Sequence, residues 1–220
     1  MKNKAIVITG SNGATARELI KYFADRFEDV IGITRNPTIS YKEENVNIIQ
    51  ADILDKNEII DLKDKIKLNH YNISCWINCA GGFNMGMNVE EDQDNWDKMY
   101  NINFQTCLNG CQIALEIMKQ QGYGRIINIG SRAAIDGFPN AAPYLVSKSS
   151  VHALTKYIAL ETSGSDITCN AILPGIIDTP SNRDAMPNED FKSWESPIDI
   201  AKKIEKVITS DMRGELIYIS

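Results

Sequence analysis

Short apolar runs rich in β-branched residues alternate with longer amphipathic stretches along this chain of 220 residues. The runs lack clear polar alternation, which is typical of strands covered on both faces. We expect seven of them to form strands, at residues 5–9, 30–34, 47–51, 74–79, 125–130, 168–173 and 215–219. The amphipathic stretches predict helices near residues 14–27, 55–68, 95–121, 144–162 and 197–209. This alternation predicts an α/β fold with a single doubly wound parallel sheet and helices on both faces.

The length of the chain predicts one domain that spans residues 1–220. Its net charge of −6 and its scattered Lys and Arg residues argue against a nucleic-acid partner. No apolar run approaches the roughly 20 residues that cross a bilayer, and the first residues lack the layout of a signal peptide. We therefore expect a cytoplasmic protein with no membrane partner.

The five cysteines are an odd number for a disulfide framework. Cys75 and Cys79 are spaced by four, as are Cys107 and Cys111, but no Cys-x-x-Cys motif is present and the two histidines lie elsewhere in the sequence. Buried free thiols are favoured over a zinc site. We expect no bound metal.

A glycine-containing turn follows the first predicted strand and leads into a helix, in the segment Thr9-Gly10-Ser11-Asn12-Gly13-Ala14-Thr15-Ala16. Gly10 and Gly13 allow a tight turn that brings backbone amides close to a pyrophosphate. The N-terminus of the helix adds a favourable partial positive charge. Such a turn can also be a tight connection and nothing more, but its place in the first βαβ unit favours a dinucleotide site.

The end of the second predicted strand bears on which dinucleotide binds. NAD sites usually place an acidic residue there, which bonds the ribose 2′-hydroxyl. The stretch Gly32-Ile33-Thr34-Arg35-Asn36 contains no acid, and the guanidinium of Arg35 can pair with a 2′-phosphate. The alternative is that Arg35 is a solvated loop residue. We favour NADP(H), while NAD(H) stays open.

Tyr144 and Lys148 lie four residues apart and therefore on one face of a predicted helix. A free tyrosine has a pKa of about 10, and a fixed ammonium group nearby lowers that pKa by favouring the phenolate. Tyr144 can then exchange a proton with a carbonyl or alcohol oxygen while hydride moves to or from a nicotinamide. Taken alone, the pair is better explained as a surface contact.

Ser131 changes this interpretation because it follows the strand predicted at 125–130, at the sheet edge where ligands bind. It precedes Tyr144 by 13 positions. A hydroxyl there can polarise a substrate oxygen beside Tyr144. In isolation, Ser131 can equally be a serine of the turn after the strand.

With these motifs in place, the chain resembles a short-chain dehydrogenase/reductase along nearly its whole length. The matching pieces fall in the order and spacing of that family, and they are residues 9–16, Asn78-Cys79-Ala80-Gly81, Asn103, Ser131, Tyr144 with Lys148, and Pro174-Gly175 with Thr179. The resemblance implies the catalytic residues Asn103, Ser131, Tyr144 and Lys148. In that family, Asn103 would hold a proton-relay water together with Lys148.

The resemblance also implies a cofactor site. Asp52 would contact the adenine, residues 78–81 would line the adenosine side, and residues 174–179 would pack on the nicotinamide and bond its carboxamide. The implied cofactor-binding residues are Gly10, Ser11, Asn12, Gly13, Ala14, Arg35, Asp52, Ile53, Asn78, Ala80, Gly81, Tyr144, Lys148, Pro174, Gly175, Ile177 and Thr179.

Two further features refine the resemblance, the first of which is a departure from the commonest family pattern. Glycines usually stand four and six places after Gly10, where this chain has Ala14 and Ala16, and the spacing of Gly10 and Gly13 resembles other branches of the family. The second feature is a likeness to the substrate-side segment of dihydropteridine reductase and its bacterial relatives, in residues 80–83, 178–183, Met186-Pro187, Asp190-Phe191 and Trp194. That reductase lacks the serine found here at position 131 and prefers NADH, so the likeness does not imply pterin specificity.

Residues 178–196 form the longest segment without predicted regular structure, and we expect them to fold over the nicotinamide as a substrate loop. Apolar contacts would come from Met186, Phe191 and Trp194, and an anionic group would meet Arg132 and Arg183. The alternative is that the aromatic residues only anchor the loop to the core.

The helices predicted at 95–121 and 144–162 are candidates for subunit contact, as family members pair through the equivalent helices. Their apolar residues are Ile113, Leu115, Ile117, Met118, Val151, Leu154 and Ile158. The alternative is that these side chains face only the sheet. We expect a homodimer or homotetramer.

The leading hypothesis is an NADP(H)-dependent oxidoreductase that transfers hydride between the nicotinamide and a small-molecule carbonyl/alcohol substrate. Tyr144 would act as general acid in reduction, Ser131 as oxyanion stabiliser and Lys148 as the group that tunes Tyr144. One alternative is a regulatory protein of the same fold that senses NADP(H) without turnover, although a sensor has no chemical need for these residues. Another is an epimerase or dehydratase with tightly held NAD, against which the missing acid near residue 34 counts.

Overall fold

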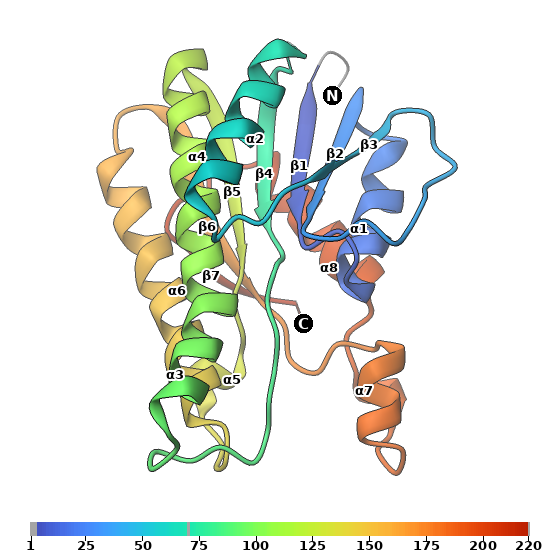
Figure 1. The fold of residues 1–220 in the computed structure, drawn as a ribbon, viewed down its shortest axis with the longest axis vertical. Coiled ribbons are helices and arrows are strands. Elements are labelled where there is room, and N and C mark those ends of the chain that lie inside the picture. Colours follow the sequence, from blue (N-terminus) through green and yellow to red (C-terminus); the bar gives the residue numbers. More distant parts are fainter. Residues whose placement is uncertain (1–3, 70, 220) are drawn as a thin grey trace.

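The computed structural model describes residues 4–69 and 71–219. Its centre is one sheet of seven parallel strands in the order β3-β2-β1-β4-β5-β6-β7 (Figure 1). The strands are β1 Ala5–Thr9, β2 Asp29–Thr34, β3 Val46–Gln50, β4 Ile73–Asn78, β5 Tyr123–Ile129, β6 Asp166–Leu173 and β7 Leu216–Tyr218. All seven predicted strands are confirmed, with bounds that differ by at most two residues.

Two buried cores lie on opposite faces of the sheet. Ala5 and Val7 belong to one core and Ile6 and Ile8 to the other, because successive strand residues face opposite sides. The first core packs against α2 (Lys56–Leu68), α4 (Thr106–Gln121) and α6 (Ala142–Glu161), and the second against α1 (Ala14–Ala24) and α8 (Pro197–Ile208). Helices on both faces confirm the doubly wound arrangement (Figure 1).

The helix predicted at 95–121 is divided into three parts. α3 (Gln93–Tyr100) continues through a π-helix (Asn101–Gln105) into α4. The chain also forms three short helices that the sequence pattern did not predict, α5 (Ala133–Asp136), α7 (Pro180–Ala185) and a 3₁₀-helix (Phe191–Ser193). They are too short to show an amphipathic period.

The expectation that residues 178–196 lack regular structure is therefore wrong. A start signal for α7 was present in the sequence, because Thr179 caps the helix by accepting a hydrogen bond from the backbone N–H of Asn182 at 3.3 Å. Pro180 occupies the first turn, where its missing N–H costs nothing.

The apolar residues considered for a subunit contact are mostly internal. Those buried against the sheet are Ile113, Ile117, Met118, Val151 and Ile158, while Leu115 and Leu154 are partly buried against the same core. These seven side chains thus face the sheet of their own chain. The oligomeric state stays a prediction.

All five cysteines are free; four are buried, and Cys79 is partly buried. In the residues that the structure describes, no group of three or more His, Cys, Asp and Glu side chains is placed to hold a metal ion. None of the helices in that part of the chain combines the length and the apolar character needed to cross a membrane.

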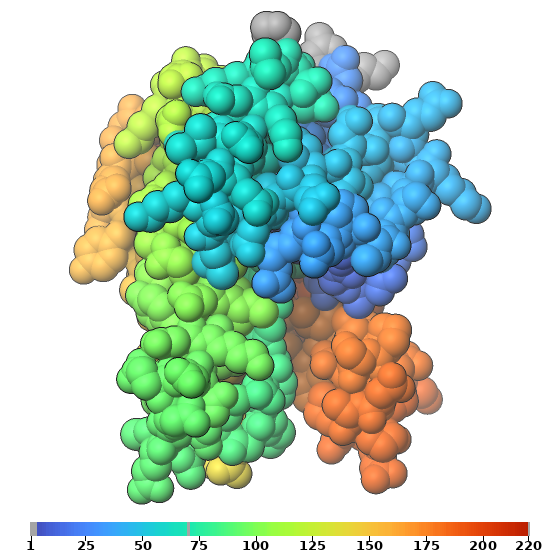
Figure 2. Space-filling view, viewed as in Figure 1, coloured from blue at the N-terminus to red at the C-terminus, as the bar shows by residue number. Residues whose placement is uncertain are grey.

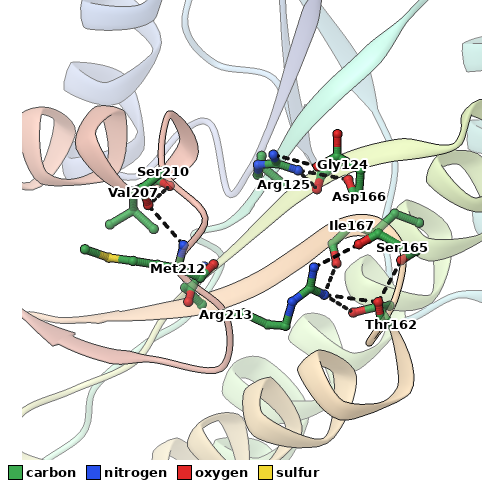
Figure 3. A network of polar contacts seen from close by, with 11 residues as sticks. Gly124, Arg125, Thr162, Ser165, Asp166, Ile167, Val207, Ser210, Met212 and Arg213 are labelled. Atoms are coloured by element: carbon green, nitrogen blue, oxygen red, sulfur yellow. Dashed lines mark hydrogen bonds and ion pairs between the residues drawn. The ribbon is translucent and has the colours of Figure 1, made fainter.

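Two arginines hold the chain together by hydrogen bonds at the end of the sheet where β5 and β6 begin (Figure 3). The guanidinium of Arg213 donates to the carbonyl oxygens of Thr162 at 3.1 Å and Ile167 at 2.6 Å. Arg125 donates to the carbonyl oxygen of Asp166 at 2.9 Å and pairs with its carboxylate at 2.8 Å. These bonds close the connection between α6 and β6, at the end of the sheet opposite to the carboxyl ends of the strands.

We predict that Arg213→Met lowers the free energy of unfolding by about 2–3 kcal/mol, because the four hydrogen bonds of Arg213 are lost and the carbonyl groups they serve lose a donor. Urea unfolding followed by circular dichroism measures the change. The control Lys119→Met, at an exposed position of α4, should change the free energy of unfolding by less than about 0.5 kcal/mol. Equal losses in the two variants would contradict the role given to Arg213.

Candidate active site

A cavity of about 650 Å³ opens where β1, β4, β5 and β6 end. Its walls come from the segments after these strands, and Figure 2 shows the hollow between the green segment that follows β4 and the orange segment that contains α7. β1 has β2 on one side and β4 on the other, so strand order reverses here. Parallel sheets bind ligands at such a reversal.

Gly10 and Ala80 bring the turns after β1 and β4 into contact. Gly10 has a φ of +73°, and a Cβ atom there would lie 2.8 Å from the Cα of Ala80. Thr9 ties the turns together, since its Oγ1 accepts hydrogen bonds from the backbone N–H groups of Cys79 at 3.1 Å and Ala80 at 3.0 Å. A side chain at position 10 would force these two turns apart.

The first turn of α1 contributes unpaired donors to the cavity. Gly13 is the N-cap of this helix and makes no side-chain capping bond, and Ala14, Thr15 and Ala16 line the cavity with it. The first amides of a helix have no intrahelical partner, and the helix dipole favours negative charge at this end. With only small side chains around it, this cradle fits a pyrophosphate.

The predicted cofactor-binding residues divide into two groups. Those that line the cavity are Gly10, Gly13, Ala14, Gly81, Tyr144, Lys148, Pro174, Gly175, Ile177 and Thr179. Those outside its lining are Ser11, Asn12, Arg35, Asp52, Ile53, Asn78 and Ala80.

Asn12, Arg35, Asp52 and Ile53 lie beyond the cavity, near the carboxyl ends of β2 and β3. The carboxylate of Asp52 accepts a hydrogen bond from a backbone N–H of the turn that follows it, at 2.9 Å, and Ile53 is buried. Arg35 is exposed and forms no ion pair with any other described residue. Arg35 is therefore free to meet an anionic group at this end of the site.

The side chain of Asn78 does not face the cavity, contrary to expectation. It is buried, its Oδ1 accepts a hydrogen bond from Trp76 Nε1 at 2.9 Å, and its Nδ2 donates to Asn128 Oδ1 at 2.9 Å. Both functional atoms are thus used inside the core, because β4 is covered on both faces. The Ser11 side chain is likewise buried away from the cavity.

Tyr144 and Ser131 meet at the wall of the cavity. Tyr144 lies in the first turn of α6 and Ser131 follows β5; both line the cavity, and the Ser131 side chain is close enough to the phenol to lower its pKa. Phe83 also packs on Tyr144, with the rings nearly perpendicular and their centroids 4.9 Å apart. The phenol thus stands between a polar and an aromatic neighbour.

Lys148 and Asn103 meet behind Gly81. Lys148 is 6% exposed, and its Nζ donates to the carbonyl oxygen of Ile129 at 2.8 Å. A Cβ atom on Gly81 would lie 2.9 Å from Asn103 Oδ1 and 3.4 Å from Lys148 Nζ. Only glycine leaves these two polar groups room at the cavity wall.

The π-helix holds the buried Asn103 in place. Asn103 Oδ1 accepts a hydrogen bond from the backbone N–H of Gly82 at 2.9 Å, and its Nδ2 donates to Ser147 Oγ at 3.1 Å. Single π turns inside α-helices are frequent at functional sites. The structure thus brings Asn103, Ser131, Tyr144 and Lys148 to one end of the cavity.

The pKa of Tyr144 is raised, whereas we expected Lys148 to lower it. Burial raises the pKa of Tyr144, and the hydrogen bond from Ser131 only opposes this rise. Burial also lowers the pKa of Lys148, whose ammonium is bonded to the carbonyl of Ile129. Tyr144 is therefore a protonated phenol at neutral pH, which suits it to donate a proton.

His152 is a residue of the site that the sequence analysis missed. It is buried, and its Nε2 accepts a hydrogen bond from the backbone N–H of Ser131 at 3.2 Å. Burial and the nearby Lys148 and Lys156 hold the pKa of His152 at about 4, so it is neutral at pH 7. The signal was its spacing, because residues 144, 148 and 152 repeat every four positions on one face of α6.

Four residues of the segment 178–196 line the cavity, but the arginine and the aromatic residues expected to meet the substrate do not. Met186 lines it, but Arg183 pairs with Asp178 at 2.6 Å, and Phe191 packs against Trp194 with ring centroids 4.8 Å apart. Arg183, Phe191 and Trp194 are not part of the cavity lining. For the aromatic pair, the structure therefore supports anchoring of the segment over contact with a ligand.

Glu195 secures the end of this segment. Its carboxylate accepts a hydrogen bond from the backbone N–H of Gly175 at 2.9 Å, and its backbone pairs with Ile176 and Asp178. Burial raises the pKa of Glu195, while Gly175 and the neighbouring Arg132 lower it. No motif in the sequence pointed to this contact.

The chain matches the family model described as short chain dehydrogenase over residues 4–190. A 3beta-hydroxysteroid dehydrogenase of Mediterraneibacter gnavus is 30% identical over 186 residues, which cover 80% of this chain and 67% of that protein. A variant of the protein ElxO with NADPH bound has a similar structure, with a TM-score of 0.90, 25% identity and coverage of 99% and 97% of the two chains. A 4-hydroxyisoleucine dehydrogenase in complex with NADH is also similar, with a TM-score of 0.83, 27% identity and coverage of 98% and 96%. The likeness to dihydropteridine reductase stays a prediction.

We predict that protonation of His152 destabilises the protein in acid. Because the folded pKa of about 4 lies below the usual value of 6.5, the unfolded chain binds the proton first, and stability is lost as the pH falls from about 6.5 towards 4. Between pH 7 and pH 5 the wild type should lose about 1 kcal/mol more than His152→Gln, allowing for solvent screening. Urea unfolding at the two pH values measures this difference, and parallel losses in both proteins would refute the assignment.

Proposed function

We propose, since the chain belongs to the short-chain dehydrogenase family, that it uses NADP(H) to reduce a small-molecule carbonyl compound to the alcohol. Membership makes it an NAD(P)-dependent oxidoreductase that acts on alcohol or carbonyl groups. The observation that carries the finer proposal is that one cavity joins the amide cradle of α1 to a protonated tyrosine beside a serine hydroxyl.

The roles of the residues follow from their positions. When bound, the reduced nicotinamide supplies the hydride. The hydroxyl of Ser131 donates a hydrogen bond to the substrate carbonyl oxygen and stabilises the negative charge that develops on it. Tyr144, kept protonated by burial, donates its proton to the same oxygen.

Lys148 and Asn103 support this proton transfer from behind Gly81. The buried ammonium of Lys148 stabilises the tyrosinate that forms once Tyr144 has given up its proton. Asn103 has its amide bonded to Gly82 and Ser147, so it keeps this wall in place.

The preference for NADP(H) rests on Arg35. Similar proteins have been solved with NADPH and with NADH bound, so the family by itself permits both. The segment after β2 carries the exposed Arg35 and no acid from residue 34 to residue 36. A guanidinium there pairs with a 2′-phosphate, whereas the ribose hydroxyl of NAD lacks an acidic partner.

The remaining assignments are also proposals. The whole chain acts as one domain, and residues 178–196 close the substrate side, where Met186 lines the cavity. Cytoplasmic location and assembly into a homodimer or homotetramer stay predictions.

We predict that Tyr144→Phe lowers kcat by about 100-fold or more, because the proton donor is lost, while the Kd of NADPH stays within about twofold. Loss of NADPH absorbance with a panel of ketones and aldehydes measures turnover, and fluorescence titration measures binding. Tyr157→Phe is the matched control, because Tyr157 lies on the same helix and is 65% exposed. Undiminished turnover in Tyr144→Phe would sink the mechanism; tight NADPH binding without turnover of any carbonyl would favour a sensor.

We predict that Arg35→Ala weakens NADPH binding by about 10- to 100-fold, since a charge-assisted pair with the 2′-phosphate is lost. The Kd of NADH should stay within about twofold and serves as the internal control. Fluorescence titration of both nucleotides on both proteins gives the four dissociation constants. If the wild type binds NADH as tightly as NADPH, the NADP preference is wrong.

A further inference from the structure

Large apolar side chains stand exposed in the cavity that Tyr144 lines. Phe83 is 51% exposed, Met85 61%, Phe138 36% and Ile176 42%, and all four line the cavity. They come from three segments, those after β4, β5 and β6. Exposed apolar surface that gathers in one concave site indicates a place for an apolar ligand group.

Phe83, Met85 and Phe138 form an apolar wall of the cavity, and backbone hydrogen bonds hold this apolar wall in place. Asn140, in the segment that carries Phe138, accepts hydrogen bonds from the backbone N–H groups of Gly86 at 2.9 Å and Met87 at 3.1 Å. The backbone N–H of Ala142 donates back to the carbonyl of Met87 at 3.0 Å. The segments that carry Phe83, Met85 and Phe138 are thus joined to each other without help from a ligand.

The aromatic rings are placed beside the reacting group. Phe83 packs edge-on against Tyr144, and the ring centroids of Phe83 and Phe138 are 6.3 Å apart. The Tyr144 ring, which would hold the carbonyl oxygen, is therefore in direct contact with an aromatic surface that lines the same cavity. A group attached directly to that carbonyl carbon would meet this surface.

The charged groups of the cavity leave no cation for an anionic substrate among the described lining residues. Arg132 pairs with Asp136 at 3.8 Å and also neighbours the carboxylate of Glu195. Lys148 is buried, with its ammonium bonded to the carbonyl of Ile129. A carboxylate on the substrate would therefore meet Arg132 only beside the carboxylate of Asp136, which also lines the cavity.

We propose that the substrate is an uncharged ketone or aldehyde with a ring-sized apolar group next to the carbonyl. The inference rests on the proposed carbonyl reduction and adds the class of compound. Phe83, Met85 and Phe138 receive the apolar group, Ser131 and Tyr144 hold the carbonyl oxygen, and the paired Arg132 and Asp136 disfavour acids.

Three α-keto compounds test the two parts of the proposal separately. Methyl benzoylformate is neutral and carries a phenyl ring on the ketone, benzoylformate has the same ring with a carboxylate, and methyl pyruvate is neutral without the ring. Their Kd values are measured by calorimetry on the wild type loaded with NADP⁺, which has no hydride to transfer and so leaves the ketone unreduced. We expect methyl benzoylformate to bind at least about tenfold more tightly than either of the others.

Variants of Phe138 test whether the apolar wall causes the preference for methyl benzoylformate. Phe138→Ala should lower the ratio of the methyl pyruvate KM to the methyl benzoylformate KM by about tenfold, because the ring loses its apolar contact. Phe138→Leu, which keeps most of the apolar volume, should retain most of that ratio and shows that the Ala effect is not a folding defect. Leu68→Ala, at a 77% exposed position at the end of α2, is the control and should change neither KM.

The outcomes separate this inference from the proposed function. If methyl benzoylformate binds most tightly but the wild type oxidises no NADPH with it, the substrate class stands and the proposed reduction fails. If the wild type reduces ketones but benzoylformate or methyl pyruvate binds as tightly as the ester, the reduction stands and the substrate class is overturned. An unchanged KM ratio in Phe138→Ala likewise overturns the role of the wall.

Discussion

The contact between the turns after β1 and β4 is the constraint on which the rest of the site depends. Thr9 bonds both amides of the second turn, and Gly10 lies against Ala80 with no room for a side chain. This contact sets the N-terminus of α1 at a fixed distance from Gly81. Because Gly81 also leaves room for Asn103 and Lys148, the same junction positions both the end of the cavity at α1 and the end at Tyr144.

Burial is the main influence on the pKa values of the titratable side chains in the site. Tyr144, Lys148 and His152 lie one helical turn apart on α6, and burial is the main cause of the shifted pKa of each. Desolvation favours the neutral form of every one of them, so the phenol keeps its proton and the imidazole stays a hydrogen-bond acceptor for Ser131. The exposed aromatic surface of Phe83 beside Tyr144 belongs to the same apolar environment.

Much of the fold was predictable because its central strands carry their own signature. A parallel strand covered on both faces must be apolar throughout, as in β1 with its five buried residues. Motifs at strand ends were predictable for the same reason, since the topology alone brings Gly10, Ser131 and Thr179 to one edge of the sheet. Short elements such as α7 were missed, because six residues show no period.

The sequence by itself determined the order of strands and helices, the glycine turn before α1 and the spacing of Ser131, Tyr144 and Lys148. Only the tertiary structure decided which side chains are buried and which groups they bond. It directed Asn78 into the core, paired Arg183 with Asp178 and bonded Lys148 to the carbonyl of Ile129. The physical reason is that spacing along the chain reflects local geometry, whereas burial and hydrogen-bond partners depend on neighbours that are distant in sequence.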